Sequence, residues 1–152
     1  MQDYQASAKV SCAPERCFRA LTRDIALWWT TRTDGAAEDA GAEFTVHFGR
    51  TFKTMRVAEL IANRTVVWRC IDSHLDLDTL ENKSEWTGTD IRWEIEASEN
   101  GARLSVTHVG LNRSIGCYSA CEKGWDFFFM TSLIPHLEKG IGRPHPQTSQ
   151  ST

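Results

Sequence analysis

Residues 119–139, SACEKGWDFFFMTSLIPHLEK, decide the fold, because they predict one long helix near the C-terminus. Ser119 and Glu122 have the spacing of a capping box, and Gly140 can take the left-handed conformation that ends a helix. Pro135 predicts a bend. The side chains that share one broad face at helical spacing are Tyr118, Cys121, Trp125, Phe128, Phe129, Ser132, Leu133, His136 and Leu137. A face this apolar, roughly 30 Å long, must be covered by other elements.

Composition and charge disfavour several classes of protein. The 152 residues include 17 Lys and Arg against 20 Asp and Glu, so a net charge of −3 argues against binding to nucleic acid or to an anionic membrane. The N-terminus lacks the pattern of a signal peptide, and no apolar run is long enough for a membrane span. An odd count of five cysteines favours free thiols in a reducing compartment. We therefore predict a cytoplasmic protein.

The remaining segments predict an antiparallel sheet. Residues 3–11 alternate as a strand does, and two short helices follow at 14–22 and 24–29. Period-two alternation then runs from Phe44 to Gly110 in about five strands, and Asn100-Gly101 gives the strongest hairpin signal. Residues 30–41 are expected to form a loop. The acidic segment 72–87 is expected to be a solvated loop, with Leu75, Leu77 and Leu80 reaching over a site.

This order of elements predicts an α+β helix-grip fold. In such a fold a curved antiparallel sheet wraps around the long C-terminal helix, which is the only predicted element long enough to cover the inner face of the sheet. We expect one domain at 1–142 and a disordered tail at 143–152, where the sequence has no apolar group to bury.

Short motifs along residues 3–140 resemble a known family. They are APERCFRALT, LWW, GAEFTV, VVWRC, WTGTDIRWEI, LSVTHVGL and the GW that begins the last helix. The chain resembles the START/Bet v 1-like (SRPBCC) superfamily, and within it the bacterial group similar to the C-terminal domain of the activator of Hsp90 ATPase. The resemblance implies a shell around an apolar cavity, which the superfamily uses for lipids, sterols, polyketides and hormones and only sometimes for catalysis. It carries no shared catalytic motif.

Candidate site residues come from the helix and from the inner face of the sheet. The predicted lining is Trp125, Phe129, Ser132 and His136 from the helix, with Trp68, Trp93, His108, Phe44 and Phe48 from the sheet. For each aromatic residue, ordinary core packing is the alternative, and for His108 and His136 it is a hydrogen-bonded core position. No third ligand converges for a metal, and neither a nucleotide fingerprint nor a nucleophile motif occurs, so no cofactor is expected.

The sequence thus favours binding of a small, largely hydrophobic molecule, without catalysis. Two alternatives stay open. One is a cyclase- or hydrolase-like enzyme that uses His108, and the other is a chaperone-interacting protein similar to the Hsp90 activator. A homodimer is also left open. The identity of the ligand does not follow from the sequence.

Overall fold

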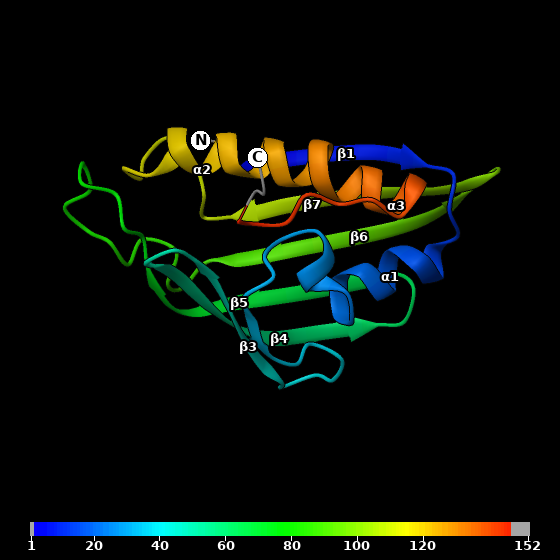
Figure 1. Cartoon of the computed structure of the whole chain (residues 1–152), viewed down its shortest axis with the longest axis horizontal. Coiled ribbons are helices and arrows are strands. Elements are labelled where there is room, and N and C mark those ends of the chain that lie inside the picture. Colours follow the sequence, from blue (N-terminus) through cyan, green and yellow to red (C-terminus); the bar gives the residue numbers. More distant parts are fainter. Residues whose placement is uncertain (1, 147–152) are drawn as a thin grey trace.

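The computed structural model describes residues 2–146 and has one sheet with its helices on one side (Figure 1). The strands are β1 (Tyr4–Val10), β2 (Thr33–Gly35), β3 (Glu43–Phe48), β4 (Thr51–Ile61), β5 (Thr65–His74), β6 (Asp90–Ser98) and β7 (Gly101–Val109). All pairs are antiparallel, in the order β1-β7-β6-β5-β4-β3-β2. The predicted α+β helix-grip fold is confirmed.

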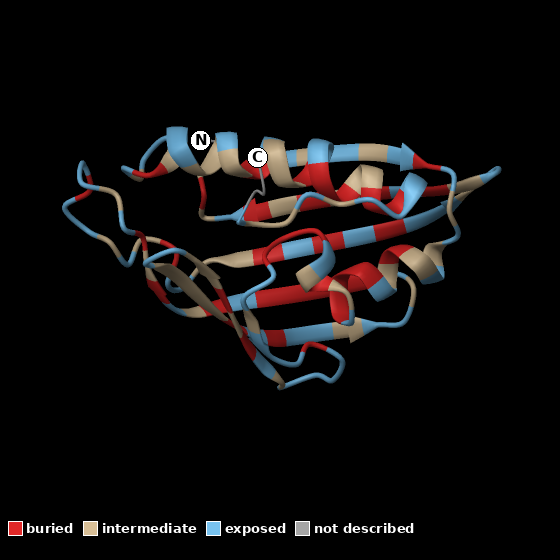
Figure 2. Cartoon of the chain, in the orientation of Figure 1, coloured by how far each residue is buried: buried red, intermediate tan, exposed pale blue. Residues whose placement is uncertain are grey.

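The inner face of the sheet follows the predicted alternation. Figure 2 shows buried and exposed residues taking turns along β6, where Ile91, Trp93 and Ile95 point inward. The hairpin into β7 turns at Asn100 and Gly101, both with positive φ. Because the register pairs Trp93 with Val106, the two strands present one continuous apolar surface to the helices.

The C-terminal helix is a single rod built from three segments. They are α2 (Tyr118–Asp126), a π-helical segment η2 (Phe127–Leu133) and α3 (Ile134–Lys139), and Gly140 closes the rod at φ 74° as predicted. The predicted capping box is wrong, because the cap residue is Cys117, which makes no side-chain cap hydrogen bond. The carboxylate of Glu122 accepts the Tyr118 hydroxyl instead.

The predicted bend at Pro135 coincides with this change of helix type. Proline lacks an N–H donor and collides with the carbonyl four residues before it, and a π-helical turn shifts that pairing by one residue. Pro135 follows η2 directly, in the first turn of α3. The helix therefore accommodates Pro135 by adopting wider, π-helical turns over Phe127–Leu133.

Helix α1 (Pro14–Thr22) packs against the C-terminal end of the long helix, and the 3-10 turn η1 (Ile25–Leu27) follows it in the chain. The Arg16 guanidinium donates to the carbonyls of His136 and Leu137, at 3.0 and 3.2 Å. A positive charge suits the carbonyl end of a helix. Helix α1 also contacts β5, β6 and β7, so it covers the part of the sheet that the long helix leaves open.

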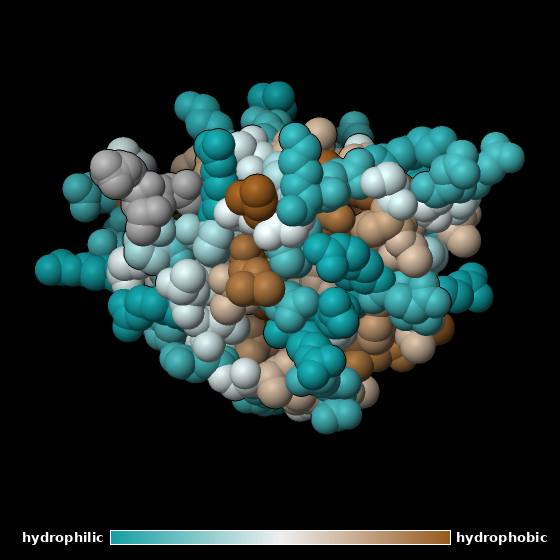
Figure 3. Space-filling view, turned by 45° about the vertical axis from the view of Figure 1, so that its right-hand side comes forward, coloured by the Kyte–Doolittle hydropathy of each residue, from teal (hydrophilic) through white to brown (hydrophobic). Residues whose placement is uncertain are grey.

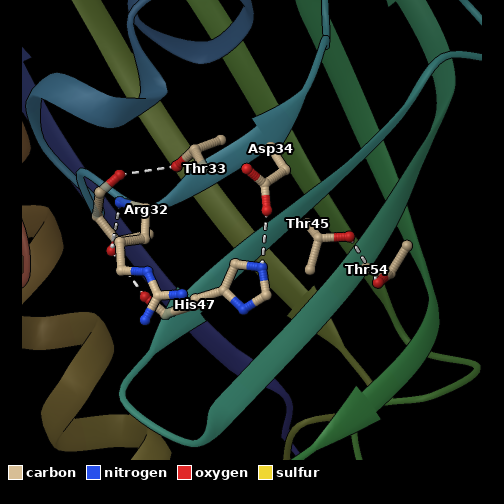
Figure 4. Close-up of polar contacts among 7 residues, drawn as sticks. Arg32, Thr33, Asp34, Thr45, His47 and Thr54 are labelled. Carbon is tan, nitrogen blue, oxygen red and sulfur yellow. Dashed lines mark hydrogen bonds and ion pairs between the residues drawn. The ribbon is translucent and has the colours of Figure 1, made fainter.

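Strand β2 lies inside the segment 30–41 that we expected to be a loop. It pairs with β3 through a polar network, shown in Figure 4, in which the Asp34 carboxylate lies 3.0 Å from the His47 ring. The Thr30 hydroxyl donates to the His47 carbonyl at 2.7 Å. A three-residue strand that contains glycine has no alternation to detect, and side-chain hydrogen bonds hold it in place.

The expected tail is partly held against the domain. The backbone N–H of Thr31 donates to the His145 carbonyl, and that of His145 donates to the Trp29 carbonyl, at 2.8 and 2.9 Å. Residues 143–146 therefore lie beside the segment that follows η1. The rest of the expected tail, 147–152, lies outside the described residues.

Candidate functional site

A pocket of about 150 Å³ opens at one end of the space between helix and sheet. Its walls come from the segment after η1, the β3–β4 hairpin, the loop between β5 and β6, and the start of the long helix. The lining residues are Trp29, Phe48, Thr51, Lys53, Leu75, Leu77, Trp86, Ala120, Cys121, Gly124, Trp125 and Phe128.

Small residues on α2 make room for this pocket. Ala120 and Gly124 are one helical turn apart, and Cys121 lies beside them on the same side. A Cβ atom added to Gly124 would meet nothing within 4 Å. The helix thus approaches the sheet here without a large side chain to fill the gap.

Aromatic rings form the walls. The Trp29 ring stacks on the Trp125 ring at 5.4 Å between centroids, and the Trp86 ring also stacks with Trp125, at 6.2 Å. The edge of Phe48 meets Trp29 at 5.8 Å. Three indole rings in near-parallel contact give the pocket rigid, apolar sides that suit a planar or aliphatic ligand.

Lys53 is the one charged residue in the lining, and sequence reasoning did not identify it. Its ammonium nitrogen lies 3.9 Å from the centroid of the Trp86 ring and 4.6 Å from that of Phe48. Burial lowers its pKa, because water is partly excluded from the charge. Within residues 2–146 it makes no ion pair.

The parity of β4 could have revealed Lys53. Thr51, Lys53, Met55 and Val57 alternate with outward residues, and Met55 and Val57 are fully buried. A lysine on the same face as two core residues points into the domain. For the pair Trp28 and Trp29 a role at the mouth of a site and a scaffold role were equally open, and Trp29 lines the pocket. Trp86 and the helix positions 120, 121 and 124 were missed, since loop side chains have no periodicity and small residues give no signal of a cavity.

Cys121 is the acidic thiol of the pocket. Its pKa is lowered to about 7, chiefly by its hydrogen bond with the Cys117 thiol, and further by the Lys53 charge and the Trp86 indole. The Trp86 Nε1–H donates to the Cys121 sulfur at 3.2 Å. The pKa of Cys117 is raised, chiefly by the same hydrogen bond. Both thiols are free.

Of the nine predicted site residues, Trp125 and Phe48 line the pocket. Trp68, Trp93, Phe44 and Phe129 lie behind it in the core, each at most 2% exposed. Ser132 is also buried, and its hydroxyl donates to the Trp28 carbonyl and accepts the backbone N–H of Arg143. His136 is buried beside α1, where burial and then the Arg16 charge lower its pKa.

His108 has protein partners on both ring nitrogens. The Trp125 Nε1–H donates to its Nδ1 at 3.0 Å. The Thr89 hydroxyl donates to the Trp86 carbonyl, so its oxygen accepts Nε2–H of His108 at 2.8 Å. Burial, with the Lys53 charge second, lowers the pKa of His108 to about 3. His108 therefore supports the pocket wall from behind as a neutral ring.

Two other kinds of site were searched for in the described part of the chain. Residues 2–146 contain no group of three or more His, Cys, Asp or Glu side chains placed to hold a metal ion. Within the same residues, no helix has the length and apolarity needed to cross a bilayer.

The family described as "Activator of Hsp90 ATPase homolog 1-like protein" matches residues 11–138. The chain belongs to this family. The predicted resemblance is thereby confirmed. No protein in the curated set matches the chain.

Solved structures agree with the assignment to the activator-like family. The solution structure of the Aha1 dimer from Colwellia psychrerythraea is 27% identical, with a TM-score of 0.75, over 93% of this chain and 100% of that chain. Protein MLL2253 from Mesorhizobium loti is 18% identical, with a TM-score of 0.69, over 85% and 92%. An HSP90 activator from Plasmodium falciparum is 17% identical, with a TM-score of 0.61, over 86% and 92%. The last two show the shared fold alone.

Proposed function

We propose that the protein binds a small, largely apolar molecule in the pocket between α2, the β3–β4 hairpin and the loop between β5 and β6. The observation that carries this proposal is the set of small helix residues facing stacked indoles, which leaves about 150 Å³ unfilled. Apolar surface removed from water stabilises a complex by roughly 25 cal/mol per Å². Most of this gain would come from the ligand's own apolar surface, because Trp29, Trp86 and Trp125 are each at most 3% exposed.

Catalysis through His108 has less support. A general base must reach the proton that it removes, directly or through one water. Both nitrogens of His108 are already hydrogen-bonded, and the ring does not line the pocket. Binding without chemistry is therefore the proposed role, in the cytoplasm.

Contact with an Hsp90-type chaperone is the second candidate function. It is supported by membership of the activator-like family and by the Aha1 dimer from Colwellia psychrerythraea, which also raises a homodimer as a candidate state. Figure 3 shows apolar residues surfacing in separate patches on the face in view. The large exposed apolar residues are Leu27, Ile61, Val109, Met130 and Ile141. Sedimentation, and co-purification with the host chaperone, would test both ideas.

The six tryptophans provide the test of ligand binding. Trp29, Trp86 and Trp125 line the pocket, whereas Trp28, Trp68 and Trp93 do not. Titration with 2-naphthamide or octanamide should shift the first three indole N–H signals in a ¹H–¹⁵N spectrum, saturably and more than the other three. Equal shifts in both groups, or no saturable shift with either compound, would contradict the proposal.

Gly124→Leu sharpens this test. The new side chain enters open space at the pocket and should abolish binding, while the gain in helix propensity raises the unfolding free energy by up to about 1 kcal/mol. Ser119→Leu is the matched control, because Ser119 is exposed on the same helix and does not line the pocket. Binding that survives Gly124→Leu would place the ligand elsewhere.

A further inference from the structure

Lys53 is a cation without a carboxylate partner at the side of an apolar pocket. Its ammonium nitrogen lies against the faces of Trp86 and Phe48, and no Asp or Glu side chain is part of the lining. We propose that Lys53 binds the carboxylate of the ligand, so that the pocket selects small apolar carboxylic acids. This inference rests on the proposed ligand-binding function and specifies its ligand class.

Three other basic side chains near the sheet have protein partners of their own. Arg56 pairs with Glu43 at 2.8 Å, and Arg69 pairs with Asp90 at 3.0 Å. Lys83, in the loop beside the pocket, donates to the carbonyls of Leu77 and Leu80 at 2.7 and 3.3 Å. Lys53 has no such acceptor within residues 2–146, and its charge is stabilised by the two aromatic faces and by nearby thiols, of which Cys121 acts most strongly.

A ligand carboxylate would supply the negative charge that the aromatic faces of Trp86 and Phe48 lack. An ammonium that is partly removed from water loses hydration, and a cation–π contact recovers only part of that loss. The groups whose charges act on Lys53 are thiols of Cys121, Cys70 and Cys117, with no carboxylate among them. A bound neutral ligand would displace the remaining water and leave the ammonium unpaired, whereas a carboxylate would form a charge-assisted hydrogen bond.

Thr51 provides a second polar contact. It lies two residues before Lys53 on β4, so both side chains are on the same face, and both line the pocket. Its oxygen accepts the backbone N–H of Asp76 at 2.8 Å, and its own hydrogen remains to be donated. One ammonium and one hydroxyl match the two oxygens of a carboxylate. A phosphate monoester would leave a further charged oxygen among aromatic rings, which disfavours it.

The experiment compares acids with their isosteric amides. Calorimetric titrations use 2-naphthoate against 2-naphthamide and octanoate against octanamide, at pH 7 and low salt. The wild type should bind at least one acid 10-fold or more tightly than its amide. Lys53→Met should remove that preference by weakening the acid, while leaving the amide within about 2-fold. Lys123→Met is the control, since Lys123 is exposed on α2 and does not line the pocket.

Each outcome separates the two proposals. If acid and amide bind equally well to the wild type, the carboxylate inference is overturned and ligand binding stands. If acid binding is equally strong in Lys53→Met, the head group lies elsewhere and the inference also fails. If neither compound of either pair binds, the proposed function itself fails. Should Lys53→Met not give a folded ¹H–¹⁵N spectrum, Lys53→Gln replaces it with the same expected loss. Binding of 2-naphthyl phosphate more tightly than 2-naphthoate would reject the carboxylate as the head group.

Discussion

The two ends of the helix–sheet interface are built from the same kinds of residue and differ in what they leave unfilled. At the open end, which is the pocket lined by α2, the helix presents Ala120, Cys121 and Gly124. At the closed end, formed by Trp28, Trp93, Phe129, Ser132 and Leu133, it presents bulky groups that meet the sheet directly. Aromatic residues alone therefore do not create a cavity, whereas small residues opposite them do.

The closed end is packed as a core and also satisfies most of its polar atoms. Phe129 stacks on Trp93 at 6.3 Å, and Trp28 meets the edge of Trp93 at 5.8 Å. The Trp28 Nε1–H donates to the Ala20 carbonyl at 2.7 Å. The indole N–H of Trp93 has no hydrogen-bond partner among the described residues. The Trp93 ring itself contacts the rings of Trp28, Trp68 and Trp125 at 5.8, 5.6 and 5.8 Å between centroids, so the indole is tightly packed although its N–H is unpaired.

The largest expected loss of unfolding free energy comes from removing a buried ring at the closed end. Phe129→Ala removes a fully buried ring and should lower the unfolding free energy by about 3–5 kcal/mol in urea titrations. Phe128→Ala, at the neighbouring position that lines the open end, should cost less than half as much because its ring is only partly buried. Equal losses would mean that the two ends are packed alike.

A smaller effect is expected from acid, through the His108 ring behind the open end. His108 has a pKa of about 3 when folded and about 6.5 when unfolded. Below pH 6.5 the His108 side chain binds a proton in the unfolded chain but not in the folded one. The unfolding free energy therefore decreases as the pH falls towards 3. At pH 4.5 this loss is about 2–3 kcal/mol relative to pH 7.

His108→Gln isolates this contribution. Glutamine can accept from Trp125 and donate to Thr89, and it does not titrate, so this variant should lose about 2–3 kcal/mol less than the wild type between pH 7 and pH 4.5. Thr89→Val serves as the control, because it removes one hydrogen bond of the ring and keeps the imidazole. An identical acid response in wild type and His108→Gln would show that His108 is protonated in the folded state.

The sequence predicted the architecture because strands and helices show a regular spacing of apolar residues or a marked start. The alternation of Ile91, Trp93 and Ile95 predicted the inner face of β6, and Pro14 predicted the start of α1. The predictions that failed concern short local features, namely the cap of the long helix and strand β2. The long helix begins after Cys117 rather than with a capping box at Ser119, and β2 is a short strand that pairs with β3 in a segment expected to be a loop.

The site was harder to predict because inward direction does not distinguish a lining residue from a core residue. Parity correctly turned Trp68 and His108 inward, and both are fully buried behind the pocket. The residues that face the pocket depend on loop placement, as for Trp86, or on the absence of side-chain bulk, as for Gly124. Among these residues, Lys53 could have been recognised from the sequence, because a lysine on the same face of β4 as Met55 is unusual in a core.

The smallest change in stability, and the sharpest contrast between the ends, is expected from alkylation of Cys121. The pKa of its thiol is lowered to about 7, chiefly by the hydrogen bond with Cys117, whereas burial raises the pKa of Cys70 to about 11, so Cys121 should ionise before Cys70 as the pH rises. Cys12 is also partly exposed, but burial raises its pKa as well. Iodoacetamide should therefore modify Cys121 at least about 10-fold faster than Cys12, as followed by peptide mass spectrometry. The added group would occupy the pocket and block 2-naphthamide, with little change in unfolding free energy. Faster reaction at Cys12, or unchanged binding after complete modification of Cys121, would show that this thiol does not face the open end.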